Sequence, residues 1–338
     1  MKSLRACALA MLTTMTVLLG ACTAPADGPA TPDGASGDGF PVTIDSSHGQ
    51  AVIESAPERI VTLGQGSAET SIALGHIPVG MEEYAWAADE TGYLPWIHQA
   101  VTEKGGDLPA LVGAGEKLDM EKILELEPDV ILAPWSGITK EQFDTLNAIA
   151  PTVSYPDQAW SVDWDEQIKI IGRALGQEAD AQKLIDDLNS QLEKAAASHP
   201  EYADHTFSYV YTTPDTLGVF LPYEQRVAVV RALGLTVDPA VNDMKEVEGT
   251  DSAIIGYENA DQLANSDLIF TFYSDEAAKK QALDNDLYAS IPAIKKGAVV
   301  ASDDPAFVTA SSMINPLTLP YALDRYAPLI DDAIAKAK

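Results

Sequence analysis

Short apolar segments with high β propensity alternate with helical segments along the first half of the chain. The apolar runs lie at residues 59–63, 77–81, 129–133 and 151–155, and helical patterns separate them. Strands that alternate with helices form parallel sheets with helices on both faces. The pattern therefore predicts an α/β fold with mainly parallel sheets.

The same pattern restarts in the second half, after a long helical stretch. Further strands are expected at residues 207–211, 267–272 and 298–301. Between the two halves, residues 178–197 carry apolar side chains three to four positions apart, which is typical of a helix that buries one face. Twenty residues make a helix of about 30 Å, roughly the width of a lobe. We expect two Rossmann-like lobes joined by one long backbone helix.

The two halves also share a short sequence pattern. In the first half, Glu121 opens a helix and Asp129 precedes an apolar strand. In the second half, Glu258 and Asp267 stand in the same relation, with one residue of difference in spacing. This similarity favours two lobes of similar build.

The first 22 residues have the layout of a secretory signal. Two basic residues precede an apolar stretch over 6–19, and Gly20 and Ala21 stand directly before Cys22. The apolar stretch is shorter than the roughly 20 residues that a transmembrane helix needs. The segment resembles a bacterial lipoprotein signal, which implies a lipid on Cys22 and anchoring to the outer face of the cytoplasmic membrane. A plain secretory signal with an incidental cysteine is the alternative.

Composition then divides the chain into five predicted parts. Residues 1–21 are the lipoprotein signal peptide, and residues 22–39 are a lipid-anchored flexible tether. Beyond the cysteine, the tether contains only Ala, Gly, Pro, Asp, Ser and Thr, which cannot build a core. The N-terminal α/β lobe is expected over 40–160, a helical bridge over 161–203, and the C-terminal α/β lobe over 204–338.

The charge and the cysteines exclude several classes of protein. A formal net charge of −30 argues against nucleic acid, because binding phosphates requires clustered Lys and Arg. It also argues against electrostatic docking on anionic lipid, so membrane contact is expected through the lipid anchor only. Cys7 lies in the signal, which leaves Cys22 as the sole cysteine of the mature chain and permits no disulfide.

Six motifs, in a fixed order, resemble one protein family. They lie at residues 57–63, 73–80, 120–133, 255–258, 291–300 and 316–320. The family is the substrate-binding protein of iron–siderophore and vitamin B12 ABC importers, and the similarity runs from about Ala56 to the C-terminus. It implies two α/β lobes joined by a rigid helix, with the ligand held in a cleft between the lobes.

The resemblance also implies partners. One surface glutamate on each lobe of such proteins pairs with arginines of the membrane permease, and by motif position these are Glu121 and Glu258. The ordinary alternative is that acids are favoured at helix starts by the helix dipole. The chain is then a monomeric receptor rather than an enzyme, without a cofactor, and ATP hydrolysis belongs to the ATPase subunits that the permease recruits.

The expected ligand is a ferric siderophore, bound by loops that follow the strands. Aromatic side chains there can pack against the apolar rim of a chelate, and Arg226 can meet its negative oxygens. Each aromatic residue has packing or surface exposure as its alternative role, and Arg226 has pairing with Glu224. The candidate ligand-binding residues are Tyr84, Trp86, Trp135, Ser136, Tyr211, Tyr223, Arg226, Tyr273 and Met313.

Other readings explain less of the sequence. Direct metal binding is not expected, since zinc or manganese sites need clustered histidines and the five here are scattered. An enzyme is not indicated, because the chain lacks a G-x-S-x-G elbow and a Walker lysine. An adhesion lipoprotein would explain the anchor but not the two lobes. Within the receptor class, the acidic chain favours neutral or cationic hydroxamate chelates, and haem and cobalamin stay open.

Overall fold

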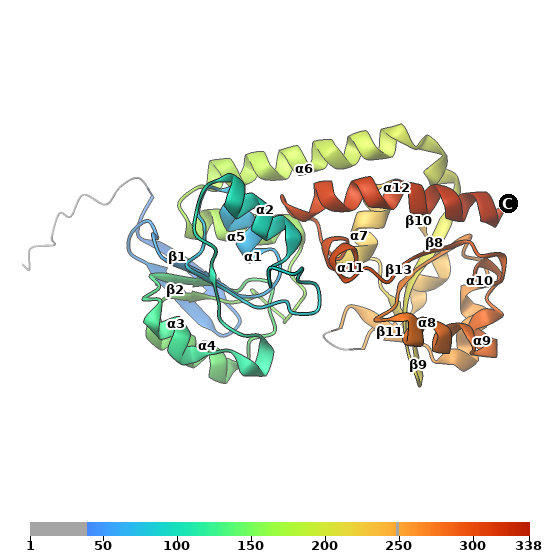
Figure 1. Cartoon of the computed structure of the whole chain (residues 1–338), viewed down its shortest axis with the longest axis horizontal. Coiled ribbons are helices and arrows are strands. Elements are labelled where there is room, and N and C mark those ends of the chain that lie inside the picture. Colours follow the sequence, from blue (N-terminus) through green and yellow to red (C-terminus); the bar gives the residue numbers. More distant parts are fainter. Residues whose placement is uncertain (1–38, 248–249) are drawn as a thin grey trace, which may run out of the picture. The chain divides into compact units, whose positions relative to one another are not determined.

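The computed structural model describes residues 39–247 and 250–338 (Figure 1). The predicted signal, Cys22 and all of the predicted tether except Gly39 lie outside the described residues. In the part that is described, no helix combines the length and the apolar character needed to cross a membrane.

The N-terminal lobe contains an antiparallel hairpin followed by five short parallel strands and their helices. Its elements are β1 (Val42–Ser46), β2 (Gly49–Ile53), β3 (Ile60–Thr62), α1 (Ser67–Ala73), β4 (Gly80–Met81), α2 (Pro95–Glu103), β5 (Ala110–Leu111), η1 (Gly115–Lys117), α3 (Met120–Glu125), β6 (Val130–Leu132), α4 (Lys140–Ile149) and β7 (Thr152–Val153). The parallel strands lie in the order β5-β4-β3-β6-β7. This confirms the parallel sheet, while the β1–β2 hairpin is an element that the sequence pattern did not predict.

Local sequence sets where the helices of this lobe begin. The Asp119 side chain accepts a hydrogen bond from the Lys122 amide and so caps α3. Thr139 and Gln142 form a reciprocal capping box at the start of α4. These caps satisfy backbone donors that a helix start otherwise leaves open.

Two helices link the lobes. They are α5 (Trp164–Ala174) and α6 (Glu178–Ser198), and they pack against each other. Gly172 of α5 lies so close to Ala181 of α6 that an added Cβ would be 2.3 Å from the alanine Cβ. Four residues of the predicted apolar stripe on α6, including Ala181 and Leu188, are buried. The expected long helix is therefore confirmed.

The C-terminal lobe has a mixed sheet. Its elements are η2 (Pro200–Asp204), β8 (Thr206–Thr213), β9 (Thr216–Phe220), α7 (Gln225–Ala232), β10 (Thr236–Val237), η3 (Pro239–Asp243), β11 (Ser252–Ile254), η4 (Tyr257–Leu263), β12 (Leu268–Phe272), α8 (Glu276–Leu283), α9 (Asp286–Ala289), α10 (Pro292–Lys296), β13 (Val299–Ser302), α11 (Pro305–Ala310) and α12 (Thr318–Ala337). The strand order is β11-β9-β8-β12-β13, with β10 also paired to β8.

Two strand pairs of this sheet depart from the expected parallel pattern. β8 and β9 form an antiparallel hairpin, and β11 pairs antiparallel to β9. The remaining pairs, β8–β12, β12–β13 and β8–β10, are parallel. The lobe is thus α/β with an antiparallel edge.

The similarity between the two halves has a structural counterpart. The Asp129 carboxylate accepts hydrogen bonds from the backbone amides of Glu58 and Arg59, just before β3. The Asp267 carboxylate likewise accepts from the amide and hydroxyl of Thr206, at the start of β8. In each lobe, therefore, the aspartate before one central strand holds the beginning of the neighbouring strand.

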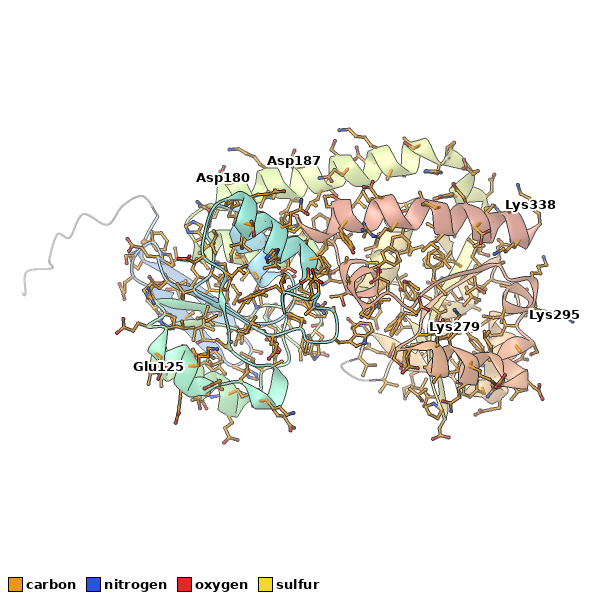
Figure 2. The ribbon with its side chains drawn as sticks, in the orientation of Figure 1. Glu125, Asp180, Asp187, Lys279, Lys295 and Lys338 are labelled. Atoms are coloured by element: carbon orange, nitrogen blue, oxygen red, sulfur yellow. The ribbon has the colours of Figure 1, made fainter. Side chains whose placement is uncertain are left out.

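Acidic side chains cover much of the outer surface. Figure 2 shows Asp180 and Asp187 projecting outward from α6, and Glu125 doing so from α3. Most of the ion pairs on helix surfaces join residues three or four positions apart, as Lys140 and Asp144 do. Such exposed pairs contribute little to stability, roughly 0.3–0.5 kcal/mol each. Folding therefore depends on the buried apolar core, which continues from α1 and α2 through α6 into the C-terminal sheet.

Candidate functional site

A cavity lies between the two lobes. Its volume of about 540 Å³ is typical of small-molecule sites, which span roughly 300–1,000 Å³. It is lined by Gln65, Glu82, Tyr84, Trp135, Trp160, Phe220, Glu224, Arg226, Thr250 and Asp251.

Loops that follow the parallel strands supply most of the N-terminal wall. Gln65 follows β3, Glu82 and Tyr84 follow β4, and Trp135 follows β6. In α/β sheets, ligands bind in the crevice outside the carboxyl ends of the strands. The position of the cavity is therefore the one that the topology favours.

A tight glycine turn after β3 brings Gln65 to the cavity. Gly64 and Gly66 have φ angles of 73° and 80°, in the left-handed region that favours glycine. A Cβ on Gly64 would lie 1.9 Å from the Trp135 carbonyl oxygen, so no larger residue fits there. The Gln167 side chain donates to the Gln65 carbonyl at 2.6 Å and ties this turn to α5.

The carboxylate of Glu82 is held by backbone amides. Gly64 N donates to Oε2 at 2.6 Å, and Gly115 N donates to Oε1 at 3.3 Å. Burial raises the pKa of Glu82 from its ordinary value, and these two amides partly offset the rise. Burial also raises the pKa of the neighbouring Tyr84, and the Glu82 and Glu69 carboxylates add to that rise. Tyr84 therefore meets a ligand as a neutral phenol.

Two tryptophans form an aromatic wall. The Trp135 and Trp160 rings meet edge to face, with centroids 4.7 Å apart and planes at 68°. Trp160 has a φ of 64°, and its ring lies against Gly137, where a Cβ would be 2.5 Å from the indole. The buried Trp135 Nε1 has no hydrogen-bond partner within residues 39–247 and 250–338. An unpaired buried donor costs free energy, and an acceptor that reaches it on binding would remove that cost.

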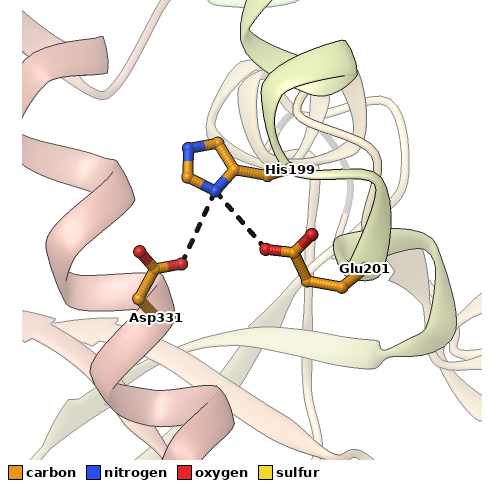
Figure 3. Close-up of side chains that lie close together, drawn as sticks. All are labelled: His199, Glu201 and Asp331. Carbon is orange, nitrogen blue, oxygen red and sulfur yellow. Dashed lines mark ion pairs between the residues drawn. The ribbon is translucent and has the colours of Figure 1, made fainter.

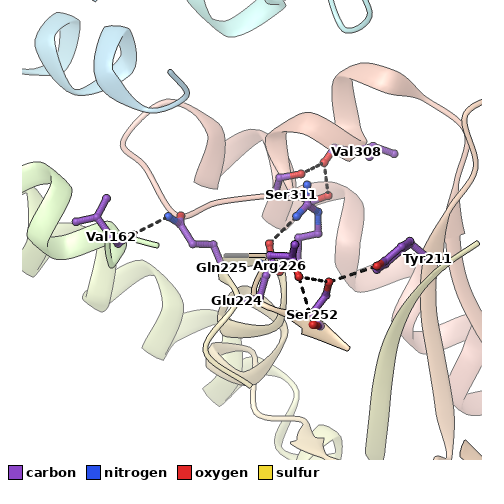
Figure 4. A network of polar contacts seen from close by, with 10 residues as sticks. Val162, Tyr211, Glu224, Gln225, Arg226, Ser252, Val308 and Ser311 are labelled. Carbon is purple, nitrogen blue, oxygen red and sulfur yellow. Dashed lines mark hydrogen bonds and ion pairs between the residues drawn. The ribbon is translucent and has the colours of Figure 1, made fainter. Parts of the chain in front are cut away.

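The start of α7 presents the only basic side chain among the lining residues. Glu224 caps α7 by accepting from the Arg226 amide at 2.7 Å, and its carboxylate also pairs with the Arg226 guanidinium (Figure 4). Burial raises the pKa of Glu224, and Arg226 partly offsets this. Burial opposes the charge of Arg226, but Glu224, together with Tyr209 and Tyr326, more than offsets it, so the pKa of the guanidinium is raised. Arg226 therefore stays charged.

The guanidinium of Arg226 is held in place on two sides but keeps an open donor. It lies over the Phe220 ring, 4.8 Å from the centroid, and 5.8 Å from that of Phe272. Its Nε is buried and has no hydrogen-bond partner in the described part of the chain. Gln225 lies between Glu224 and Arg226 in the sequence. Its side-chain amide donates to the Val162 carbonyl at 3.2 Å and so joins this lobe to the segment before α5 (Figure 4).

Asp251 adds a carboxylate from the segment before β11. Its φ of 48° lies in the left-handed region, and Leu221 N donates to its carbonyl at 2.9 Å. Burial, followed by the charges of Glu224, Glu246 and Asp163, raises the pKa of Asp251 to about 6. The carboxylate is therefore mostly ionised at neutral pH.

Three of the nine predicted ligand-binding residues, Tyr84, Trp135 and Arg226, line this cavity. Arg226 also forms the expected ion pair with Glu224, so it both lines the cavity and pairs with an acid of the protein. The ligand-binding roles of the other six stay predictions, and these residues lie outside the lining. They are Trp86, Ser136, Tyr211, Tyr223, Tyr273 and Met313.

Local contacts explain where those six side chains go. Trp86 is 48% exposed, and Tyr223 is half exposed and donates to Glu246 at 2.7 Å. Ser136 is buried and donates to the Ala133 carbonyl at 2.8 Å. The other three pack inside the C-terminal lobe: the Tyr211 ring lies 5.0 Å from that of Phe220, and Tyr273 and Met313 are buried.

Sequence reasoning did not single out the remaining lining residues. Glu82 lies two positions before Tyr84, and Glu224 lies between Tyr223 and Arg226, but only these aromatic and basic neighbours were predicted to bind the ligand. Trp160, Phe220 and Asp251 had no signal of this kind, because their place at the cavity depends on contacts between distant segments.

One cluster of metal-ligand side chains occurs among the described residues, and it lies away from the cavity. His199, Glu201 and Asp331 meet where α6 ends beside α12, with His199 Nδ1 3.6 Å from the glutamate and 3.7 Å from the aspartate oxygen (Figure 3). The cluster already has protein partners. Tyr202 donates to Asp331 Oδ1 at 2.8 Å and stacks on the His199 ring. These contacts indicate that the cluster has a structural role, in which it connects the end of α6 to α12.

The two glutamates predicted to dock a permease are exposed. Glu121 lies in the first turn of α3, and Glu258 lies in the first turn of η4. Neither carboxylate takes part in an ion pair within the part of the chain that the structure describes. Both are therefore available to a partner.

Comparison with known proteins agrees with this architecture. The sequence profile of the periplasmic binding protein family matches residues 60–306. The probable siderophore-binding lipoprotein YfiY of Bacillus subtilis is 25% identical over 278 residues, which are 77% of this chain and 79% of that protein. The iron(3+)-hydroxamate-binding protein YxeB of the same organism is 23% identical over 88% of each chain. The crystal structure of Streptococcus pneumoniae PiaA in complex with ferrichrome has a TM-score of 0.79 and 29% identity, covering 88% of this chain and 99% of its own.

Proposed function

The chain belongs to the periplasmic binding protein family, and from this premise we propose that it captures a ferric hydroxamate siderophore outside the cytoplasmic membrane and delivers it to an ABC permease. Its role is binding and delivery, and the ATPase subunits of the importer perform the only chemical step. The proposal rests on one observation above the others: Arg226 and Trp135 line the cavity between the lobes, and each carries a buried donor that has no hydrogen-bond partner among the described residues.

Hydroxamate chelates match those donors. The oxygens that bind iron in a hydroxamate carry negative charge and keep lone pairs that accept hydrogen bonds. A guanidinium makes charge-assisted hydrogen bonds to such oxygens, which are stronger than neutral ones. Trp135 Nε1 supplies a second donor, and the rings of Trp135, Trp160 and Phe220 offer apolar surface to the rest of the chelate.

The charge of the cavity favours hydroxamates over catecholates. Three carboxylates, those of Glu82, Glu224 and Asp251, line the cavity together with one guanidinium, that of Arg226. A ferric tris-catecholate carries three negative charges and would be repelled by such a wall, whereas a ferric trihydroxamate is neutral or positive. The named ligands of PiaA and YxeB, ferrichrome and iron(3+)-hydroxamate, support the same class.

The remaining parts of the proposal concern anchoring and docking. We infer from the signal motif that a lipid on Cys22 holds the receptor at the outer face of the membrane, and the relative YfiY bears the name of a lipoprotein. Glu121 and Glu258 present one exposed carboxylate from each lobe. Two separated carboxylates can each contact a basic patch of a permease. Such a two-point contact sets both the position and the orientation of the receptor on the permease.

A fluorescence titration tests the ligand class. Residues 23–338 are titrated with ferrichrome, ferrioxamine B, ferric enterobactin, haem and cobalamin, while the intrinsic tryptophan emission, to which Trp135 and Trp160 contribute, is followed. Saturable quenching by a ferric hydroxamate, and weaker quenching by its iron-free form, is the expected result. Tight binding of haem or cobalamin alone would keep the family and overturn the ligand. The absence of binding to any member, checked by calorimetry, would reject the proposal.

A further inference from the structure

The three carboxylates of the cavity differ in how they are compensated. Glu224 pairs with Arg226, and Glu82 accepts from the amides of Gly64 and Gly115. The Asp251 carboxylate receives no side-chain or backbone hydrogen bond and no ion pair from the described ranges 39–247 and 250–338. Among the described residues, Asp251 is therefore the one carboxylate of the cavity lining that has neither a cation nor a hydrogen-bond donor as a partner.

The surroundings of Asp251 increase this negative potential. The ionisable groups that act on its carboxylate are Glu224 at the start of α7, Glu246, and Asp163 at the start of α5, and all three are acids. Arg226, the only cation among the described residues that line the cavity, is already paired with Glu224. A half-buried carboxylate in such a setting attracts a cationic group more strongly than one in open solvent does.

The position of Asp251 is fixed by the backbone rather than by its side chain. Its left-handed φ and the hydrogen bond from Leu221 N to its carbonyl place it at the cavity lining, beside Thr250. Residues held in sparsely populated backbone regions are often found at ligand sites. A carboxylate that costs free energy to bury, and that has no partner in the fold, gains one when a cationic ligand binds.

We propose that Asp251 is the counter-ion for an ammonium group of the ligand, so that the cavity prefers a positively charged ferric trihydroxamate over a neutral one of the same shape. The inference rests on the proposed function and narrows it. Arg226 and Trp135 then recognise the iron-hydroxamate centre that all such chelates share, whereas Asp251 discriminates among them by charge.

A matched ligand pair tests this. Ferrioxamine B carries one ammonium group, and its N-acetylated form lacks that charge but keeps the same iron centre. Dissociation constants for both are measured by tryptophan quenching at pH 7.5, for the wild type, Asp251→Asn and Glu246→Gln. The control acid Glu246 acts on Asp251 but does not line the cavity, and it is bonded to Tyr223.

The wild type is expected to bind ferrioxamine B on the order of fivefold more tightly than the acetylated form, which corresponds to about 1 kcal/mol for a partly exposed ion pair. Asp251→Asn should abolish this preference, and Glu246→Gln should keep it. The preference should also weaken progressively as the pH falls below about 6, because Asp251 becomes protonated and neutral over that range.

The outcomes separate this inference from the proposed function. Equal affinity of the wild type for both ligands would overturn the inference and leave the proposed function standing. A preference that survives in Asp251→Asn would overturn the assignment to Asp251. Failure of both ligands, together with ferrichrome, to bind the wild type would overturn the proposed function and the inference with it.

Discussion

In the proposed function, recognition of the iron centre depends most on Arg226. Its guanidinium is charged because Glu224 lies next to it, and it is kept over the Phe220 ring at 4.8 Å. A guanidinium already held in one rotamer loses little conformational entropy when a ligand binds, so more of each hydrogen bond contributes to affinity. The pair thus prepares the site before the ligand arrives.

Replacing this side chain should weaken binding without unfolding the protein. Arg226→Ala removes hydrogen bonds to charged ligand oxygens, worth roughly 1.5–3 kcal/mol, so ferrichrome affinity should fall about 10- to 100-fold. The matched control is Arg231→Ala on the same helix, whose side chain is exposed and donates to the Pro222 carbonyl outside the cavity. Tryptophan quenching gives both constants. Equal losses in the two variants would argue against a direct contact from Arg226.

At the scale of elements, the glycine turn after β3 joins fold and site. Gly64 must have both a left-handed backbone and no side chain, because the Trp135 carbonyl oxygen occupies the space. This close approach brings the loops after β3 and β6 together and allows Gly64 N to hold Glu82. The turn therefore fixes three parts of the cavity wall at once.

Alanine substitutions at Gly64 and Gly105 distinguish the cost of a left-handed backbone from the cost of a steric clash. Gly105 has a φ of 67°, close to that of Gly64, but an added Cβ there meets nothing within 4 Å. Gly105→Ala should lower the free energy of unfolding by about 1 kcal/mol, the cost of the left-handed backbone alone. Gly64→Ala should lower it by more than about 3 kcal/mol, since a backbone collision adds to the strain. Urea unfolding measures both, and equal effects would contradict the packing described for Gly64.

Local sequence signals predicted most elements of this fold. The apolar stripe of α6 and the short strands β3, β6 and β12 follow from spacing alone, because each is set by neighbouring residues. The β8–β9 hairpin was missed. The Tyr211 ring packs over Gly218 of β9, where an added Cβ would lie only 2.1 Å from the ring. Because this position requires glycine, β9 has a weaker strand pattern in the sequence. A strand stabilised by such a cross-strand contact is not visible from its own residues.

The candidate site was predicted only in part for a related reason. Tyr84, Trp135 and Arg226 follow strands or begin a helix, so topology alone brings them to one edge. Trp160 and Asp251 lie in irregular segments with left-handed backbone, and their contacts join residues far apart in the chain. No periodicity or motif marks such positions. Family resemblance indicated the cleft, but the identity of its walls required the three-dimensional structure.

At the level of the whole molecule, the surfaces proposed for ligand binding and for permease docking are separate. The ligand cavity lies between the lobes, whereas Glu121 and Glu258 are exposed on α3 and η4 and are absent from its lining. A permease that contacts both glutamates is in touch with both lobes. The account therefore requires that the two functions can be lost separately.

The double variant Glu121→Ala/Glu258→Ala tests that separation. Ferrichrome affinity should stay within about twofold of the wild type, while uptake of iron-55 ferrichrome by cells expressing the importer falls at least about tenfold. The control is Glu125→Ala/Asp261→Ala, which removes exposed acids from the same two elements. A loss of affinity in the test variant, or an equal loss of uptake in the control, would contradict the docking assignment.

The most direct measurement of the central claim is the position of the iron. Crystals of residues 23–338 grown with ferrichrome give an anomalous difference map at the iron absorption edge. The account predicts one iron peak inside the cavity between Trp135 and Arg226, with oxygen atoms of the chelate, and no protein atom, bound to the metal. An iron peak outside this cavity, or iron bound directly by side chains such as those of His199, Glu201 and Asp331, would contradict it.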